Sequence, residues 1–191
     1  MTYVGFIGVL WAPILLSAFL AFVASALAWT VMPHHKSEWL GLPGQDGVMD
    51  ALKKSAPAAG QYMIPWVEDP KERRSPEAMK RWAEGPSGTV TIWPRGPMNM
   101  GKMMGQQFVF FLIVSIFVAY VARHSGLDSG ADYLAVFRVI GTVAVMSYVF
   151  GTVPESIWFG RPWRSFWLGA VDGVAYGLLT AGCFGWLWPR A

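Results

Sequence analysis

The sequence predicts an all-α membrane protein, a four-transmembrane-helix bundle with a small α+β extramembrane insert between its first and second helices. Three observations predict this class. Four long stretches of the 191-residue chain are almost free of charged residues, and a polar segment, residues 33–102, separates the first from the second. Hydrophobic residues make up 54% of the chain. Charged residues make up only 14% of it, whereas a soluble domain carries roughly 25%.

The first span is predicted between Tyr3 and Val31, because no Asp, Glu, Lys or Arg precedes Lys36 in the chain. A helix of about 20 apolar residues is long enough to cross a bilayer. Pro13 lies within this segment, and we expect it to kink the helix, since proline lacks the N–H group that the helical ladder requires.

The insert is predicted to contain two short helices and two short strands. Residues 46–55 carry apolar side chains at helical spacing, and the segment Ser75-Pro76-Glu77 is typical of a helix start, with serine as the N-cap. Residues 61–66 and 88–93 are predicted to be strands. Two strands are too few to bury a core, so we expect the insert to lean on the membrane surface or on a partner.

The three remaining spans are predicted at residues 103–122, 133–153 and 165–188. Arg138 interrupts the third span and Asp172 the fourth. More Lys and Arg residues lie next to the membrane on the insert side than on the other, which favours a cytoplasmic insert. The predicted division of the chain is residues 1–32 for the first transmembrane helix, 33–102 for the insert and 103–191 for the other three helices.

Asp172 is the most unusual residue, because an ionisable side chain within a membrane costs at least a few kcal/mol unless it is paired or hydrated. Asp172, Tyr176 and Thr180 recur at four-residue spacing and form one polar stripe along the predicted helix. One interpretation is a proton or cation site inside the bundle. The other is a carboxyl group that is protonated or bound by a hydroxyl such as that of Tyr148 or Ser147.

Small residues predict close packing between the first and fourth spans, because small side chains at four-residue spacing let two helices approach closely. We expect Asp172 to lie at the edge of this contact. The small residues are Gly169, Gly173 and Gly177 on the fourth span and Ser17, Ala21 and Ser25 on the first.

Arginine and tryptophan residues mark the membrane boundary. Arg138 approaches the middle of the membrane from the face opposite to that of Asp172, and it either pairs with Asp172 or extends to the interface. The segment between the third and fourth spans is predicted to anchor the protein to lipid headgroups or to an acidic partner. Its anchoring residues are Trp158, Arg161, Trp163 and Arg164.

A further cluster raises the question of a metal site. His34 and His35 follow the first span, and methionines precede the second span on the same membrane face. Imidazoles and thioethers together can hold Cu(I). However, adjacent histidines rarely bind one ion together, and methionines commonly fill apolar space. We therefore expect no cofactor, and keep as metal candidates His34, His35, Met98, Met100, Met103 and Met104.

The sequence contains no phosphate-binding loop, dinucleotide fingerprint, zinc-protease motif or nucleophile elbow, and no nucleic-acid recognition module. The expected function is that of a non-catalytic accessory, scaffold or assembly subunit of a larger membrane complex. The expected partners are the lipid bilayer and either other membrane-protein subunits or further copies of the chain, and the expected location is a bacterial inner membrane.

Two alternatives remain open. The first is a small oligomeric transporter or channel-like protein that uses Asp172, and the second is a metal-handling membrane protein that uses His34, His35 and the methionines of residues 98–104.

Overall fold

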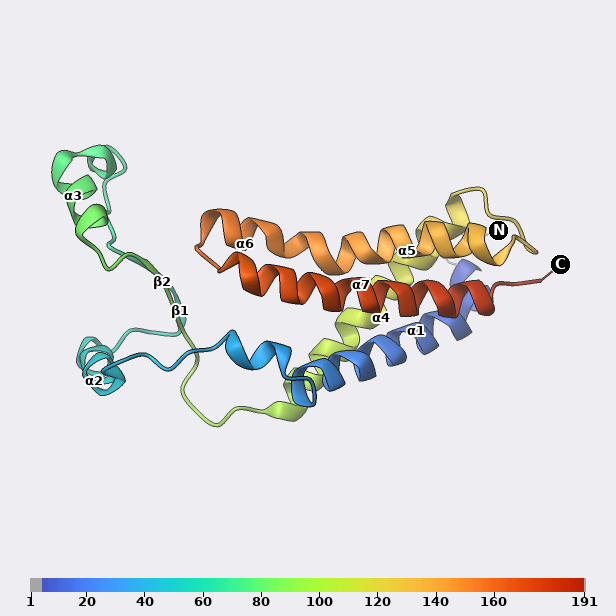
Figure 1. The fold of residues 1–191 in the computed structure, drawn as a ribbon, viewed down its shortest axis with the longest axis horizontal. Coiled ribbons are helices and arrows are strands. Elements are labelled where there is room, and N and C mark those ends of the chain that lie inside the picture. Colours follow the sequence, from blue (N-terminus) through green and yellow to red (C-terminus); the bar gives the residue numbers. More distant parts are fainter. Residues whose placement is uncertain (1–4, 191) are drawn as a thin grey trace. The chain divides into compact units, whose positions relative to one another are not determined.

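The computed structural model describes residues 5–190 and is mostly helical. It contains four helices that are long and apolar enough to cross a membrane, as the sequence predicted (Figure 1). Tyr3, where the first span was predicted to begin, lies outside the described residues. The four candidate spans are α1 (Gly5–Thr30), α4 (Met100–His124), the segment Tyr133–Trp158 and α7 (Trp163–Trp186). The third span consists of three consecutive elements, α5 (Tyr133–Val149), η3 (Phe150–Thr152) and α6 (Val153–Trp158).

The insert contains the predicted helices and strands. The two strands pair antiparallel, with Gly60 opposite Ile92 and Ile64 opposite Gly88. The Oγ of Ser75 accepts a hydrogen bond from the backbone N–H of Ala78, which confirms serine as the N-cap of the second insert helix. The elements of the insert are α2 (Gln45–Ser55), β1 (Gly60–Ile64), η2 (Glu72–Arg74), α3 (Pro76–Glu84) and β2 (Gly88–Ile92).

The chain forms two compact units. The insert unit consists of residues 40–98 and 155–161, and the helical unit consists of the rest. The short 3₁₀ helix η1 (His34–Ser37) belongs to the helical unit, although the sequence-based division placed it in the insert. This difference arises because η1 contacts α7.

Helix α1 is kinked, as Pro13 predicted. Leu10, three residues before Pro13, has non-helical backbone angles (φ −107°, ψ 16°). Proline offers no N–H to the preceding turn and its ring crowds that turn, so the distortion falls on the N-terminal side of the proline.

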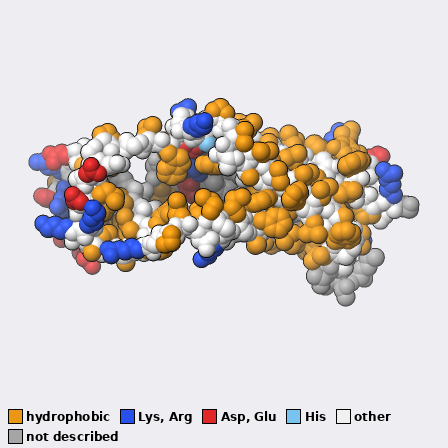
Figure 2. Space-filling model, turned by 90° about the horizontal axis from the view of Figure 1, so that it is seen from below, with side chains coloured by type: hydrophobic (Ala, Val, Ile, Leu, Met, Phe, Trp, Pro, Cys, Tyr) orange, Lys and Arg blue, Asp and Glu red, His pale blue; other side chains and the backbone are white. Residues whose placement is uncertain are grey.

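The helical unit carries its apolar side chains on the outside as well as in its core. Within the unit, α7 contacts both α5 and α1, and α1 also contacts α4. Trp11, Phe19 and Phe117 are each more than half exposed. On the face seen in Figure 2, hydrophobic side chains cover most of this unit. Four apolar helices with such a surface suggest an integral membrane protein.

The glycine stripe of α7 packs against α5 rather than against α1, which corrects the sequence-based expectation. A Cβ atom at Gly177 would lie 2.5 Å from Cγ2 of Val145, and one at Gly173 would lie 2.8 Å from Cγ2 of Val149. A Cβ at Gly169 would meet nothing within 4 Å. The stripe faces α5 because α7 turns its other face, with Asp172, Tyr176 and Thr180, toward the interior.

The small residues of α1 point inward and lie between α4 and α7, so α1 does contact the fourth span as expected, although not through its glycines. Ser17, Ala21 and Ser25 are all buried. The hydroxyl groups of Ser17 and Ser115 are hydrogen-bonded at 3.0 Å, so the stripe joins α1 to α4. Ala21 packs in a cluster with Phe111 of α4 and Tyr176 of α7.

The close approach of α7 to α5 yields a first prediction. Gly177→Ala should destabilise the protein by about 1–3 kcal/mol, because the added methyl group meets the backbone of Val145. Gly169→Ala is the matched control on the same stripe and should leave the thermal midpoint in detergent nearly unchanged. Equal midpoints for the two variants would contradict the packing of Gly177 against α5.

Candidate metal centre

The candidate site forms where the chain leaves α1. After α1 ends at Thr30, Pro33 precedes the single turn η1. Backbone hydrogen bonds hold this turn, from Lys36 N–H to Pro33 O at 3.1 Å and from Glu38 N–H to His35 O at 3.1 Å. The turn packs against α7, and the rings of its two histidines lie 4.1 Å apart between centroids.

Both histidines contact the same carboxylate. The Nε2 atom of His34 lies 3.0 Å from Oδ1 of Asp172, and the Nε2 atom of His35 lies 2.7 Å from Oδ2. One ligand atom from each of the three residues lies within 4.8 Å of the others. The exposed fraction is only 5% for His35 and 8% for Asp172, so the contact is largely removed from solvent.

A second carboxylate fixes the other side of the His35 ring. Nδ1 of His35 is hydrogen-bonded to Oε1 of Glu38, whose side chain is only 6% exposed. Burial alone would lower the pKa of His35, but its hydrogen bonds to Asp172 and Glu38 and the charges of both carboxylates raise its pKa above the usual value. The indole of Trp29 stacks on the imidazole at 4.0 Å and covers one face of it.

The polar stripe of α7 is buried, and Asp172 is bound by a hydroxyl, as one interpretation of the sequence held, and by two histidines that the sequence did not indicate. The hydroxyl of Tyr176 donates to Oδ2 of Asp172 at 3.4 Å, and the hydroxyl of Thr180 donates to the carbonyl of Tyr176 at 2.9 Å. Neither of the partners suggested from the sequence bonds to Asp172. The Ser147 hydroxyl donates to the carbonyl of Val143, and no hydrogen bond joins the buried Tyr148 hydroxyl to Asp172.

Arg138 lies apart from this site. Its side chain is exposed, and within residues 5–190 it forms no ion pair with Asp172. The sequence left open whether Arg138 pairs with Asp172 or extends outward, and exposure favours the second. Asp172 lies near the level of Val149 in α5, because its neighbour Gly173 packs there, whereas Arg138 lies three turns away along α5.

The expected anchor residues are on the surface. Arg161 pairs with Glu155 at 3.0 Å, which the sequence analysis did not foresee. Trp158, Trp163 and Arg164 are exposed. Their role as a lipid or partner anchor stays a prediction.

The methionine candidates are exposed rather than gathered in a core. Met98 belongs to the insert unit, while Met100, Met103 and Met104 lie in the first turns of α4. The ligand atoms that the structure brings together come from histidine and aspartate instead. Sequence reasoning missed this because it placed the histidines at the membrane face and Asp172 deep in the fourth span. The sequence did contain one signal of a histidine site, namely the adjacent pair His34-His35 with a carboxylate, Glu38, three residues after the second histidine.

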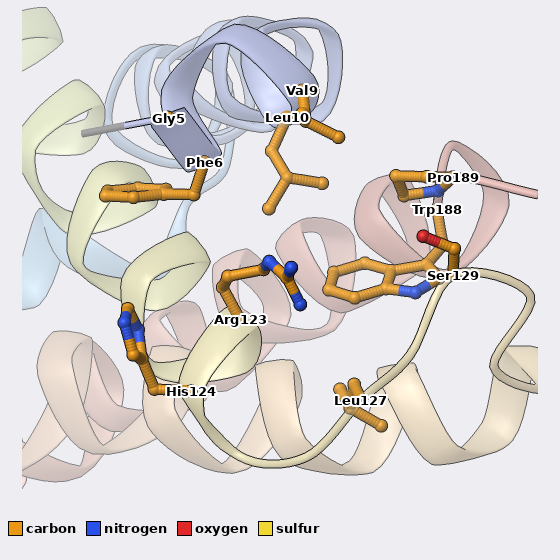
Figure 3. A pocket seen from close by; sticks show the side chains of 10 residues that line it. All are labelled: Gly5, Phe6, Val9, Leu10, Arg123, His124, Leu127, Ser129, Trp188 and Pro189. Atoms are coloured by element: carbon orange, nitrogen blue, oxygen red, sulfur yellow. The ribbon is translucent and has the colours of Figure 1, made fainter. Parts of the chain in front are cut away.

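A pocket of about 370 Å³ lies at the opposite end of α1. Figure 3 shows the Arg123 side chain extending between Leu10 and Trp188. Two polar groups of this pocket are engaged within the chain, since His124 bonds to the carbonyl of Tyr120 and the Trp188 indole donates to the carbonyl of Asp128. The lining residues are Gly5, Phe6, Val9, Leu10, Arg123, His124, Leu127, Ser129, Trp188 and Pro189.

Comparison of this chain with protein-family models, with curated proteins and with solved structures gives no match.

Proposed function

We propose that this chain is an integral membrane protein, of a bacterial inner membrane, that binds a divalent transition-metal ion through His34, His35 and Asp172. The observation that supports the proposal is the convergence of two imidazole Nε2 atoms and one carboxylate, within 4.8 Å, in a largely buried position. The proposal takes up the metal-handling alternative, with Asp172 in place of the methionines.

The donor set favours a particular class of metal. Two imidazole nitrogens and one carboxylate oxygen form a set found in catalytic zinc sites and in non-haem iron sites. Cu(I), which the methionines suggested, prefers softer sulfur ligands. Asp172 also contributes the negative charge that a buried cation requires, so the site suits Zn²⁺ or Fe²⁺ better than Cu(I).

The surroundings of His35 support the same proposal. Histidines that bind metals usually donate their second ring N–H to a carboxylate or carbonyl, which fixes the ring orientation and the tautomer. Glu38 occupies this position at Nδ1 of His35, leaving Nε2 directed at Asp172. Stacking on Trp29 further restricts the ring.

A second prediction tests the ligands. Protein purified with a tag that contains no histidine, then loaded with Zn²⁺ and washed, should retain about one zinc ion per chain by elemental analysis. The variants His34→Ala, His35→Ala and Asp172→Ala should each lose this zinc, because each removes one of three ligands.

His124→Ala is the matched control, since it removes the one histidine that lies at the far end of α4. It should bind zinc as the wild type does. Failure of the wild type to retain zinc or iron, or equal retention in the ligand variants, would contradict the proposed site.

A third prediction concerns Glu38. Glu38→Gln replaces an anionic acceptor with a neutral one next to Nδ1 of His35 and should weaken zinc binding about 10–100-fold. The measurement is competition with a chromophoric chelator, with Glu84→Gln as the control because Glu84 is an exposed residue of α3 in the insert. Unchanged affinity in the Glu38 variant would mean that Glu38 does not orient the ligand.

The transporter alternative gains less support from a single chain. The polar stripe of α7 ends at Thr180. One turn further along α7 lies Phe184, which is apolar and fully buried, as is Ile140 of α5 in the same core cluster. A path for an ion beyond this point would have to be built by further copies or another subunit.

The surface of the insert favours a second function, that of an accessory subunit. Within residues 40–98, Ala78 is the only buried residue, whereas large apolar side chains such as Leu40, Trp66 and Trp93 are more than half exposed. A unit with so small a core gains stability by covering these side chains. We propose that it docks on another membrane-protein subunit or on a second copy of the chain.

A fourth prediction tests this docking. A photo-crosslinking amino acid placed at Trp66 or Trp93 and activated in native membranes should give one adduct of defined mass, because these side chains would lie in a protein contact. The same amino acid at Lys53, an exposed position on the charged side of α2, is the control and should give none. Only lipid adducts at all three positions would contradict the docking proposal.

A further inference from the structure

The protein ligands at the proposed metal site leave the coordination of the ion incomplete. Among residues 5–190, the cluster of His, Cys, Asp and Glu side chains around this point has three members. The next carboxylate, that of Glu38, bonds to Nδ1 of His35 and is thereby turned to the far side of the ring. Structural zinc sites have four protein ligands, whereas sites with three keep a position for water or another small ligand.

The cluster is accessible from one side only. The side chains of His35 and Asp172 are 5% and 10% exposed, while that of His34 is 26% exposed. The indole of Trp29 covers a face of the His35 ring. A small ligand would therefore approach the ion past the edge of His34.

The charge of the ion and its three ligands favours an anionic oxygen ligand. Asp172 offsets one of the two positive charges of the ion, and Glu38 is paired with the N–H group of His35. The Tyr176 hydroxyl donates its one proton to Oδ2 of Asp172 at 3.4 Å and so helps to hold this ligand carboxylate in place. His34 lies four residues after the end of α1, near the level where lipid headgroups meet a membrane-spanning helix.

We infer that the ion at His34, His35 and Asp172 keeps an exchangeable position that takes a small anionic oxygen donor, a phosphate or a carboxylate. This inference rests on the proposed metal site. The phosphate can come from solution or from an anionic lipid headgroup, since both present the same oxygen atoms to the ion.

The test uses the full chain loaded with Co²⁺, whose visible absorption bands report coordination number and ligand type. In detergent solution, inorganic phosphate or acetate should shift these bands in a saturable way, and His124→Ala should show the same shift. Bands that do not respond to either anion, in a protein that has bound cobalt, would overturn the exchangeable position while leaving the metal site intact. A protein that shows no cobalt bands would overturn both proposals.

A second arm separates the two sources of the phosphate. The cobalt protein is placed in nanodiscs of phosphatidylcholine alone or with added phosphatidic acid. A band shift caused by phosphatidic acid, together with loss of the response to inorganic phosphate, assigns the position to a lipid headgroup. A retained response to inorganic phosphate in both nanodiscs assigns it to a soluble anion. Bands that are the same in every condition overturn the inference.

Discussion

The buried carboxylate of Asp172 constrains the rest of the helical unit. A carboxylate held within an apolar helix bundle is costly unless charged or polar groups compensate it. Here the compensation comes largely from outside the four long apolar helices, because His34 and His35 reach it from the turn after α1. The position of η1 against α7 is a consequence of this contact. The contact also accounts for the assignment of residues 34–37 to the helical unit rather than to the insert.

Two faces of α7 make different contacts, because they carry different side chains. Gly173 and Gly177 allow the backbone of α5 to approach, which a larger side chain at either position would prevent. The face with Asp172 and Tyr176 turns to the interior and to the histidines. Close packing on one face therefore fixes the orientation of the helix, and this orientation presents the carboxylate to η1. A displacement of α7 would change both contacts together.

Most of the fold could be predicted from the sequence, whereas the site could be predicted only in its parts. Apolar runs, Pro13 and the Ser75 cap carry local information, so the spans, the kink and the insert helix followed from them. Asp172 could be recognised as unusual because a single ionisable residue within an apolar segment is conspicuous in the sequence itself. Its pairing with His34 and His35 could not be predicted, since it depends on how a turn of four residues folds back across 137 positions of sequence. The helix that the glycines face was missed for the same reason, because a stripe of small residues does not specify its partner.

The site also lies at a connection in the chain, and this relates the two proposed functions. Residue 40, where the insert begins, follows Glu38 by two positions, and Glu38 bonds to the same ring that contacts Asp172. Binding of a metal ion would replace a set of hydrogen bonds by stronger coordinate bonds and so hold the turn before the insert more rigidly against α7. The insert has almost no core of its own. A more rigid turn before it would therefore favour the proposed docking of the insert on a partner. The two proposed functions are therefore compatible, because His34 and His35, which would bind the ion, lie in the turn just before the unit that is proposed to dock.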